Sequence, residues 1–325
     1  MHLTDIQFIK GVFSTKHTLN MMHNFEVQVR KMMENLQVVF AERIRMDGNF
    51  YHYPHKPKVS DIELLAISTV AESLSINSEN DLFNRIGKEI PHLFSGRITR
   101  PRFNIRRRAL NIHMEDFLKL SHERLFTQQN AFIVDSTPLP ICKLARIPRL
   151  KICKDNSHIN PQLATCYAKN EKYYGFKMHL ITTQKDAIPV AFSITSSRVH
   201  DVKALEQMLN EQAISAGQLL GDKGYVSNPL QLELFENKKI ELKAQPRINM
   251  KTPLNWTPKM GAVRRRIETV FSQCQDQFRL GQNFAKTFNG LVTRITHKLS
   301  GFLFCQLINI QNNRPATLVK SALFS

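Results

Sequence analysis

From residue 131 onward, short apolar runs alternate with segments of helical period, and this order constrains the fold more than any other feature. The run 131–134 is continuously apolar, which is typical of a buried central strand. Apolar and polar residues alternate over 173–182 and over 190–194, which predicts two neighbouring antiparallel strands. The remaining predicted elements are strands at 218–220 and 240–244 and helices at 201–212, 228–237 and 263–278.

The predicted order is three strands, a helix, a strand, a helix, a strand and a helix. It indicates an α/β fold of the ribonuclease-H-like type, with a mixed five-stranded sheet flanked by helices. The residues before the first strand have helical patterns instead, including a capping box at Ser60 and a second helix start at Ser78. We therefore predict a helical N-terminal domain over 1–125, which we expect to bind DNA, the α/β domain over 126–312 and a C-terminal tail over 313–325.

Three acidic residues stand at informative places in this pattern. Asp135 and Asp222 each follow an apolar strand, and Glu268 lies on the last predicted helix. The first and fourth strands are neighbours in the predicted sheet, so the two aspartates are expected side by side at the carboxyl ends, where ligands bind. Three close carboxylates favour a hard divalent cation, Mg²⁺ or in its place Mn²⁺. Each acid alone also fits a turn, a cap or an ion pair, whereas the three together predict a metal site.

The charge balance points to a polyanionic partner. The chain has 45 Lys and Arg against 27 Asp and Glu, a formal net charge of +18, and a pI near 9.9. No apolar segment approaches the roughly 20 residues that span a bilayer, and the N-terminus has no signal-peptide pattern. The five cysteines are scattered without a C-x-x-C pair, as expected of reduced thiols. We therefore expect a cytoplasmic, nucleoid-associated protein that binds DNA and no membrane.

Two groups of cations are candidates for DNA phosphate contacts. Six arginines fall within 97–108, on a helix expected from Pro101, and an ordinary surface helix is the alternative interpretation. The helices before it fit a helix-turn-helix unit and a plain packing domain equally well. The individual candidates for DNA binding are Arg106, Arg107, Arg108, Lys223, Arg264, Arg265 and Arg266.

Several polar residues near the acids are weaker candidates. Lys177 and His179 lie on the polar side of their predicted strand, and His200 precedes a helix. For Asp201 the simpler interpretation is an N-cap of that helix. The Pro-containing loop over 247–260 interrupts the α/β pattern and is either a substrate contact or a plain connection.

Six segments occur in the order VDSTPLPICKLAR, YYGFKMHL, VHD, GDKGY, RINMK and RRRIETVF. Together with the upstream stretch SDIELLAISTVAESLSINSENDLF, they resemble DDE transposases of the insertion sequence 982 family, over roughly residues 58 to 310. The resemblance implies a Mg²⁺-dependent ribonuclease-H-like catalytic domain acting on terminal inverted repeats, with Asp135, Asp222 and Glu268 at the three acidic positions. Water would cleave at the element end, and the freed 3′-OH would attack target DNA. Pairing two ends implies a homodimer on DNA.

One departure concerns the Tyr-x2-Arg-x3-Glu-x6-Lys signature of many related transposases. Arg264 and Glu268 fit it, but Gly261 stands at the Tyr position and Gln275 at the Lys position. Two alternatives to an active transposase follow from the same residues. One is a ribonuclease-H-like nuclease without strand transfer, and the other is a catalytically inactive DNA-binding derivative.

Overall fold

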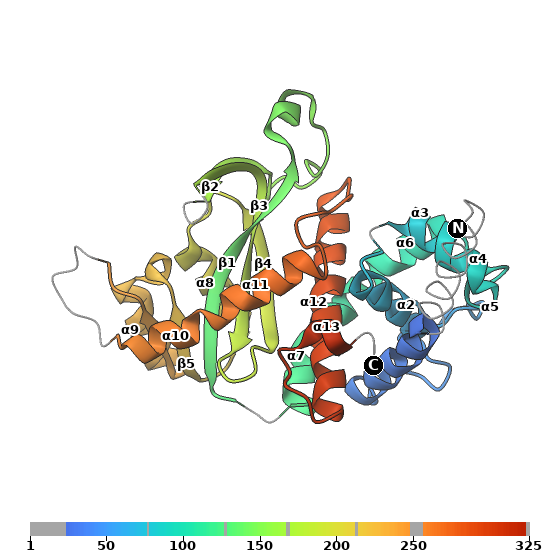
Figure 1. The fold of residues 1–325 in the computed structure, drawn as a ribbon, viewed down its shortest axis with the longest axis horizontal. Coiled ribbons are helices and arrows are strands. Elements are labelled where there is room, and N and C mark those ends of the chain that lie inside the picture. The colour runs from blue at the N-terminus through green and yellow to red at the C-terminus, as the bar shows by residue number, and fades with distance from the viewer. Residues whose placement is uncertain are drawn as a thin grey trace, which may run out of the picture.

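The structure is a computed structural model that describes residues 24–76, 78–126, 129–166, 170–211, 214–247 and 256–322. Figure 1 shows a helical part built from the N-terminal residues beside an α/β part, with the long helix α12 (Phe288–Gln311) between them. Most of the predicted loop over 247–260 lies outside the described residues. No helix in the described ranges is long and apolar enough to cross a membrane.

Short helices make up the N-terminal part. A helix spanning residues 24–39 precedes them. The short helices are α2 (Asp61–Ser73), α3 (Glu79–Asp81), the π-helical turn η1 (Leu82–Ile86), α4 (Gly87–Glu89), α5 (Pro91–Phe94), α6 (Arg100–Ala109) and α7 (Asn111–Arg124). Both predicted helix starts are confirmed, because Ser60 Oγ accepts from the Glu63 amide and Ser78 Oγ from the Asp81 amide. All of α2 except Glu63 is buried, which favours a packing helix over a DNA-reading unit.

The sheet contains β1 (Ala131–Cys142), β2 (Gln162–Cys166), β3 (Glu171–Thr183), β4 (Pro189–Ser196), β5 (Gly217–Gly221) and β6 (Ile240–Ala244). β3 pairs antiparallel with β1 and β4, and β5 pairs parallel with β1 and β6. The order β4-β3-β1-β5-β6 confirms the ribonuclease-H-like mixed sheet. β2 is an additional short strand that pairs with the first residues of β3, on the edge that β4 continues.

Side chains of successive strand residues point to opposite faces of the sheet, so β1 has apolar side chains on both faces. Helices cover both of these faces. On one face, Phe132 and Val134 pack with α8 (Asp201–Asn210) and α9 (Asn228–Lys238). On the other face, Ile133 belongs to the larger core that contains α7, α11 (Arg266–Asp276) and α12. This alternation directs Asp135 to the α11 side and its neighbour Ser136 to the α8 side.

α12 joins the two parts of the chain. Its residues from Ile295 to Asn309 are all buried, and it packs against α2, α6, α7 and β4. One continuous core therefore runs from the N-terminal helices to the sheet. The division at residue 125 stays a prediction, and α12 takes part in the core on both sides of it. A short helix, α13 (Val319–Ala322), packs back on α12 within the predicted tail.

The helix predicted over 263–278 is wrong as a single element. Two helices form there, α10 (Pro258–Arg264) and α11, and Arg265 lies between them. Thr257 caps α10 by accepting from the Met260 amide. Arg264 thus ends one helix while Glu268 lies in the first turn of the next, and this break positions both side chains over β1.

Candidate active site

Asp135 and Asp222 lie level with each other on neighbouring strands. Ile133 of β1 pairs with Leu220 of β5, and each aspartate follows its paired residue by two positions. β5 ends at Gly221, whereas β1 continues to Cys142 along β3. Asp135 is therefore not at a strand end as expected, but at the point where its parallel neighbour stops.

Glu268 is connected to Asp135 through Arg264. The Arg264 guanidinium donates from Nη1 to Asp135 Oδ2 at 3.0 Å and from Nη2 to Glu268 Oε1. The Arg264 and Asp135 side chains are 13% and 15% exposed, whereas Glu268 is 50% exposed. Arg264 therefore acts here as an internal cation between two of the three predicted acids.

Asp201 is a fourth carboxylate at this place, and the N-cap interpretation of it is wrong. The N-cap position of α8 is His200, which makes no side-chain cap bond. Asp201 Oδ1 instead accepts from Lys177 Nζ at 2.8 Å and from Ser136 Oγ at 3.2 Å. A Cβ on Gly224 would lie 2.8 Å from Asp201 Oδ2 and 2.9 Å from Asp222 Oδ1, so these two carboxylates flank the same small space.

The sequence contained a signal for Asp201 in the segment VHD, directly after a predicted strand. Sequence reasoning missed its contacts because they depend on β3 lying under the start of α8. His179 on β3 is fully buried and places Nδ1 3.6 Å from Asp201 Oδ1, while its Nε2 lies 3.0 Å from Thr195 Oγ1. Burial lowers the pKa of His179 to about 4, although the Asp201 charge opposes that shift.

The electrostatics of the acids follow from burial and mutual repulsion. Burial and the charges of Asp222 and Glu268 raise the pKa of Asp135 to about 7. The hydrogen bond from the Ser136 amide and the charge of Arg264 lower this pKa but do not outweigh the rise. Burial and the Asp201 charge also raise the pKa of Asp222, although the Gly224 amide donates to Asp222 Oδ1 at 2.8 Å. The hydroxyl of buried Tyr225 shares this field, since burial and the charges of all three aspartates raise its pKa. Such clustered shifts are typical of functional sites.

The donor chemistry of the cluster fits a hard divalent cation. Its groups are carboxylate oxygens that repel one another, and a cation removes that repulsion. Arg264 already supplies one positive charge between Asp135 and Glu268. Within the described ranges, however, no three His, Cys, Asp or Glu side chains lie at metal-holding spacing. The carboxylates are thus gathered but not arranged as a finished ligand set.

The raised pKa of Asp135 predicts a stability effect in metal-free protein. The folded state holds a proton up to about pH 7, whereas an unfolded Asp loses it near pH ~3.9. Asp135 therefore stabilises the fold below the unfolded pKa, and this contribution is lost as pH rises through 7. We expect Asp135→Asn to raise the thermal midpoint in EDTA at pH 8 by several degrees, and by less at pH 5.5. Each kcal/mol of added stability raises the midpoint of a chain of this size by roughly 2–4 °C. Asp276→Asn, an exposed change on α11, should show no such pH dependence.

The space beside Gly224 provides a second prediction. An alanine Cβ there would meet both carboxylates at under 3 Å, and the backbone of Gly224 does not have a positive φ that would itself exclude alanine. We expect Gly224→Ala to displace Asp201 and Asp222 and to slow catalysis by roughly 10²-fold while the protein stays folded. Gly261→Ala is the matched control, since its Cβ would meet only Trp256 Nε1 at 3.6 Å. Equal rates for the two variants would show that the carboxylate positions do not matter.

Three predicted DNA contacts near the acids have different surroundings. Lys223 is exposed directly after Asp222, and Arg265 is exposed at the break between α10 and α11. Arg266 is also exposed, but its guanidinium donates to the backbone carbonyls of Gln184 and Lys185. Gln275, at the Lys position of the signature, accepts from the Gly281 amide at 2.9 Å and thus closes the turn after α11.

The arginines predicted on α6 do not form one phosphate-binding row. Arg107 is buried and pairs with Glu72 and Glu79, each at 2.9 Å, so its guanidinium is used inside the fold. Arg106 pairs with buried Asp61 at 2.6 Å and is likewise used inside the fold. The physical reason is that two buried carboxylates on α2 need cations. Arg108 alone of the three remains without an ion pair in the described structure.

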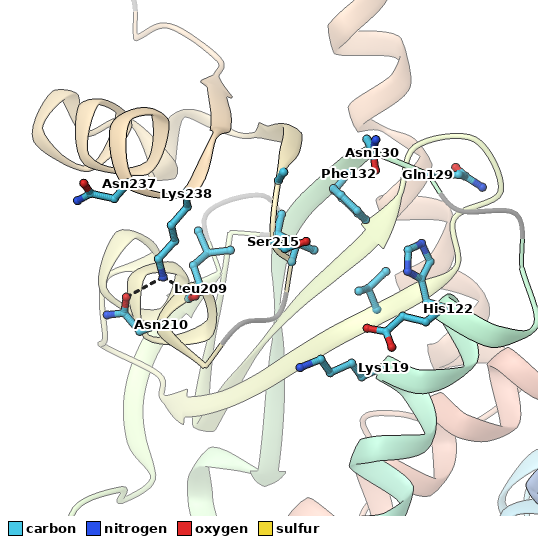
Figure 2. Close-up of a pocket in the computed structure, with 14 residues that line it drawn as sticks. Lys119, His122, Gln129, Asn130, Phe132, Leu209, Asn210, Ser215, Asn237 and Lys238 are labelled. Atoms are coloured by element: carbon cyan, nitrogen blue, oxygen red, sulfur yellow. Dashed lines mark hydrogen bonds between the residues drawn. The ribbon is translucent and has the colours of Figure 1, made fainter. Parts of the chain in front are cut away.

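One large cavity lies away from the acids. It measures about 650 Å³ and lies at the amino ends of the parallel strands, where Asn130 precedes β1 and Ser215 precedes β5. Figure 2 shows His122 and Lys119 of α7 on one side of it and Lys238 bonded to Asn210 on the other. The acids lie at the opposite end of the parallel strands, where β5 stops at Gly221. This cavity is therefore separate from the candidate active site.

Comparison with known proteins bears on the α/β part. Residues 126–283 match the family model described as the transposase DDE domain, and this range contains Asp135, Asp222 and Glu268. None of the curated proteins matches the sequence. A solved structure with similarity is the piggyBac transposase synaptic complex with hairpin DNA, at 11% identity and a TM-score of 0.47, over 94% of this chain and 79% of that chain. The similarity to the transposase DDE domain is thus limited to residues 126–283, which include the strands and helices that carry the acids.

Proposed function

We propose that the protein is a DDE transposase of the insertion sequence 982 type. It cleaves DNA at the inverted repeats of its element and transfers the 3′-OH to target DNA. The observation that carries this proposal is the level placement of Asp135 and Asp222 on β1 and β5, with Glu268 linked to Asp135 through Arg264. The match of the surrounding region to the transposase DDE domain supports the same reaction class.

In this proposal, Asp135, Asp222 and Glu268 hold Mg²⁺, for which Mn²⁺ substitutes. When bound, such ions activate the attacking oxygen and stabilise the leaving one. Lys177 and Ser136 hold Asp201 beside Asp222, on the other side of Gly224. Exposed Lys223 and Arg265 contact the DNA backbone beside the acids. Arg264 neutralises Asp135 and Glu268 in the metal-free protein, a role that a bound cation would supply.

The partners are the inverted repeats and target DNA, with a homodimer forming when two ends are paired, in the cytoplasm at the nucleoid. The test is incubation of purified protein with Mg²⁺ and labelled duplexes that carry the repeats flanking its gene, plus a circular target. Cleavage with joined products supports a transposase. Cleavage without joined products identifies a nuclease, and end binding without any nick identifies an inactive DNA-binding derivative.

A further inference from the structure

A second, cationic cavity lies between α6 and the start of α12. It measures about 290 Å³. Five of its lining side chains are cationic, and one is acidic: Arg100, Arg107, Arg108, Lys286, Arg294 and Glu79. It belongs to neither the acid cluster nor the cavity of Figure 2. Such crowding of like charges is unfavourable unless an anion offsets it.

The acidic side chain does not neutralise this group. Glu79 is already bound by Arg107 at 2.9 Å, and Arg294 Nη1 lies 3.8 Å from the same oxygen. Arg107 and Arg294 also share Glu72, so both are fixed by carboxylates inside the fold. Their Nε atoms are buried and have no hydrogen-bond partner in the described structure.

The other three cations have no internal partner. Arg100 and Lys286 are exposed, and Arg108 is partly exposed with a buried, unbonded Nε. None of the three takes part in an ion pair within the described residues. Two come from α6 and one from the loop before α12, so separate elements direct uncompensated charge to one cavity. That is the arrangement expected of a built anion site and not of a solvated helix face.

The helix end is not what makes this site. Thr287 Oγ1 accepts from the Gly290 amide, and Asp155 Oδ1 accepts from the Phe288 amide at 2.8 Å. The first turn of α12 thus has internal acceptors, and the cations carry the attraction. The exposed aromatic ring of Phe284 borders the same cavity at 68% exposure. Cations beside an exposed aromatic ring suit a nucleic-acid strand, whose phosphates and bases use both.

We propose that this cavity binds a backbone phosphate of DNA, through Arg100, Arg108 and Lys286. The proposal rests on the proposed function in that DNA is the substrate. Glu268 lies in the first turn of α11, and the chain that follows α11 reaches the cavity at Phe284 and Lys286.

The test measures binding of a fluorescein-labelled 30-base-pair duplex by anisotropy in EDTA, over a series of NaCl concentrations. We expect Arg108→Gln/Lys286→Gln to weaken binding by roughly tenfold and to reduce the slope of log K against log salt by about 0.9 for the lost phosphate. The matched control is Lys88→Gln/Lys239→Gln, which also removes two exposed positive charges. Lys286→Gln alone changes an exposed loop residue and should leave the fold intact, so a reduced slope in this single variant cannot come from misfolding.

Equal slopes for the pocket and control variants overturn the proposal. A second result also overturns it. Inorganic phosphate would raise the thermal midpoint of wild type but not of the Arg108→Gln/Lys286→Gln variant, while this variant and the control bind DNA equally. The site would then bind free phosphate and not DNA. Since EDTA prevents cleavage, the result does not depend on catalysis. A slope difference without any cleavage by wild type in Mg²⁺ would support the phosphate site while removing the transposase assignment.

Discussion

Asp222→Asn and Asp135→Asn each reduce Mg²⁺-dependent DNA cleavage by about 10³-fold or more, because several kcal/mol of transition-state stabilisation depend on these charges. The amide keeps the shape of the carboxylate and still offers one oxygen, which at Asp222 accepts from the Gly224 amide. What it removes is the negative charge that attracts a cation. The measurement is the single-turnover rate of cleavage on labelled repeat DNA.

Two controls separate this effect from a loss of structure. Asp276→Asn removes an exposed carboxylate at the far end of α11 and should cleave at the wild-type rate. Asp135→Asn is expected to be inactive and yet more stable than wild type at pH 8, so its inactivity cannot come from unfolding. Full DNA binding in EDTA by the inactive variants would place the loss in the chemical step. Wild-type cleavage by either variant would show that the acids are wrongly assigned.

Glu72→Gln destabilises the fold by about 3–5 kcal/mol, because it leaves buried cations without their counter-charge. Glu72 is buried on α2 and accepts from Arg107 at 2.9 Å, from Arg294 at 3.1 Å and from Lys298 at 2.9 Å. The Lys298 side chain is fully buried. Burial opposes ionisation of Glu72, but the three cations outweigh it and lower its pKa. The effect is read from urea unfolding followed by circular dichroism.

Two further variants test whether the loss of the Glu72 charge causes this effect. Glu89→Gln changes an exposed carboxylate in the same part of the chain and should alter stability by less than 1 kcal/mol. Adding Lys298→Met to Glu72→Gln removes one orphaned cation and should recover part of the lost stability. Because the folded pKa of Glu72 is lowered, its contribution is present above the unfolded pKa of about 4.3 and is lost as pH falls. A loss below 1 kcal/mol for Glu72→Gln would contradict the network.

This network also links structure to the proposed function. It joins α2, α6 and α12, and α12 packs in turn against β4 of the sheet. Arg107 and Arg294 line the cationic cavity between α6 and α12, and both pair with Glu72. The same ion pairs that hold the helices together therefore set the positions of α6 and of the loop before α12.

Much of the α/β part was predictable because strand and helix periods are local properties of the chain. The continuous apolar run before Asp135, the alternation over 173–182 and the run before Asp222 located three strands correctly. β2 was missed, since its sequence QLATC has no clear alternation and pairs only through β3. The break at Arg265 was missed because apolar spacing continues across it.

The roles of charged side chains were less predictable, because a charge is read correctly only when its partner is known. Arg107 looked like a phosphate contact until its pairing with two glutamates was visible. Asp201 looked like a helix cap until Lys177 and Ser136 were seen beside it. Arg100 and Lys286, which lie far apart in the sequence, meet at one cavity only in the folded chain.

The sequence by itself determined the strand and helix order, the positive charge and the three acids, because each depends on residue type and spacing. Only the tertiary structure decided which acids share a space, which cations are used internally and which remain for a ligand. Asp135 and Asp222 are level because Ile133 pairs with Leu220, and no local pattern contains that pairing. Long-range packing thus brings charged residues together in a candidate active site and in a separate cationic cavity.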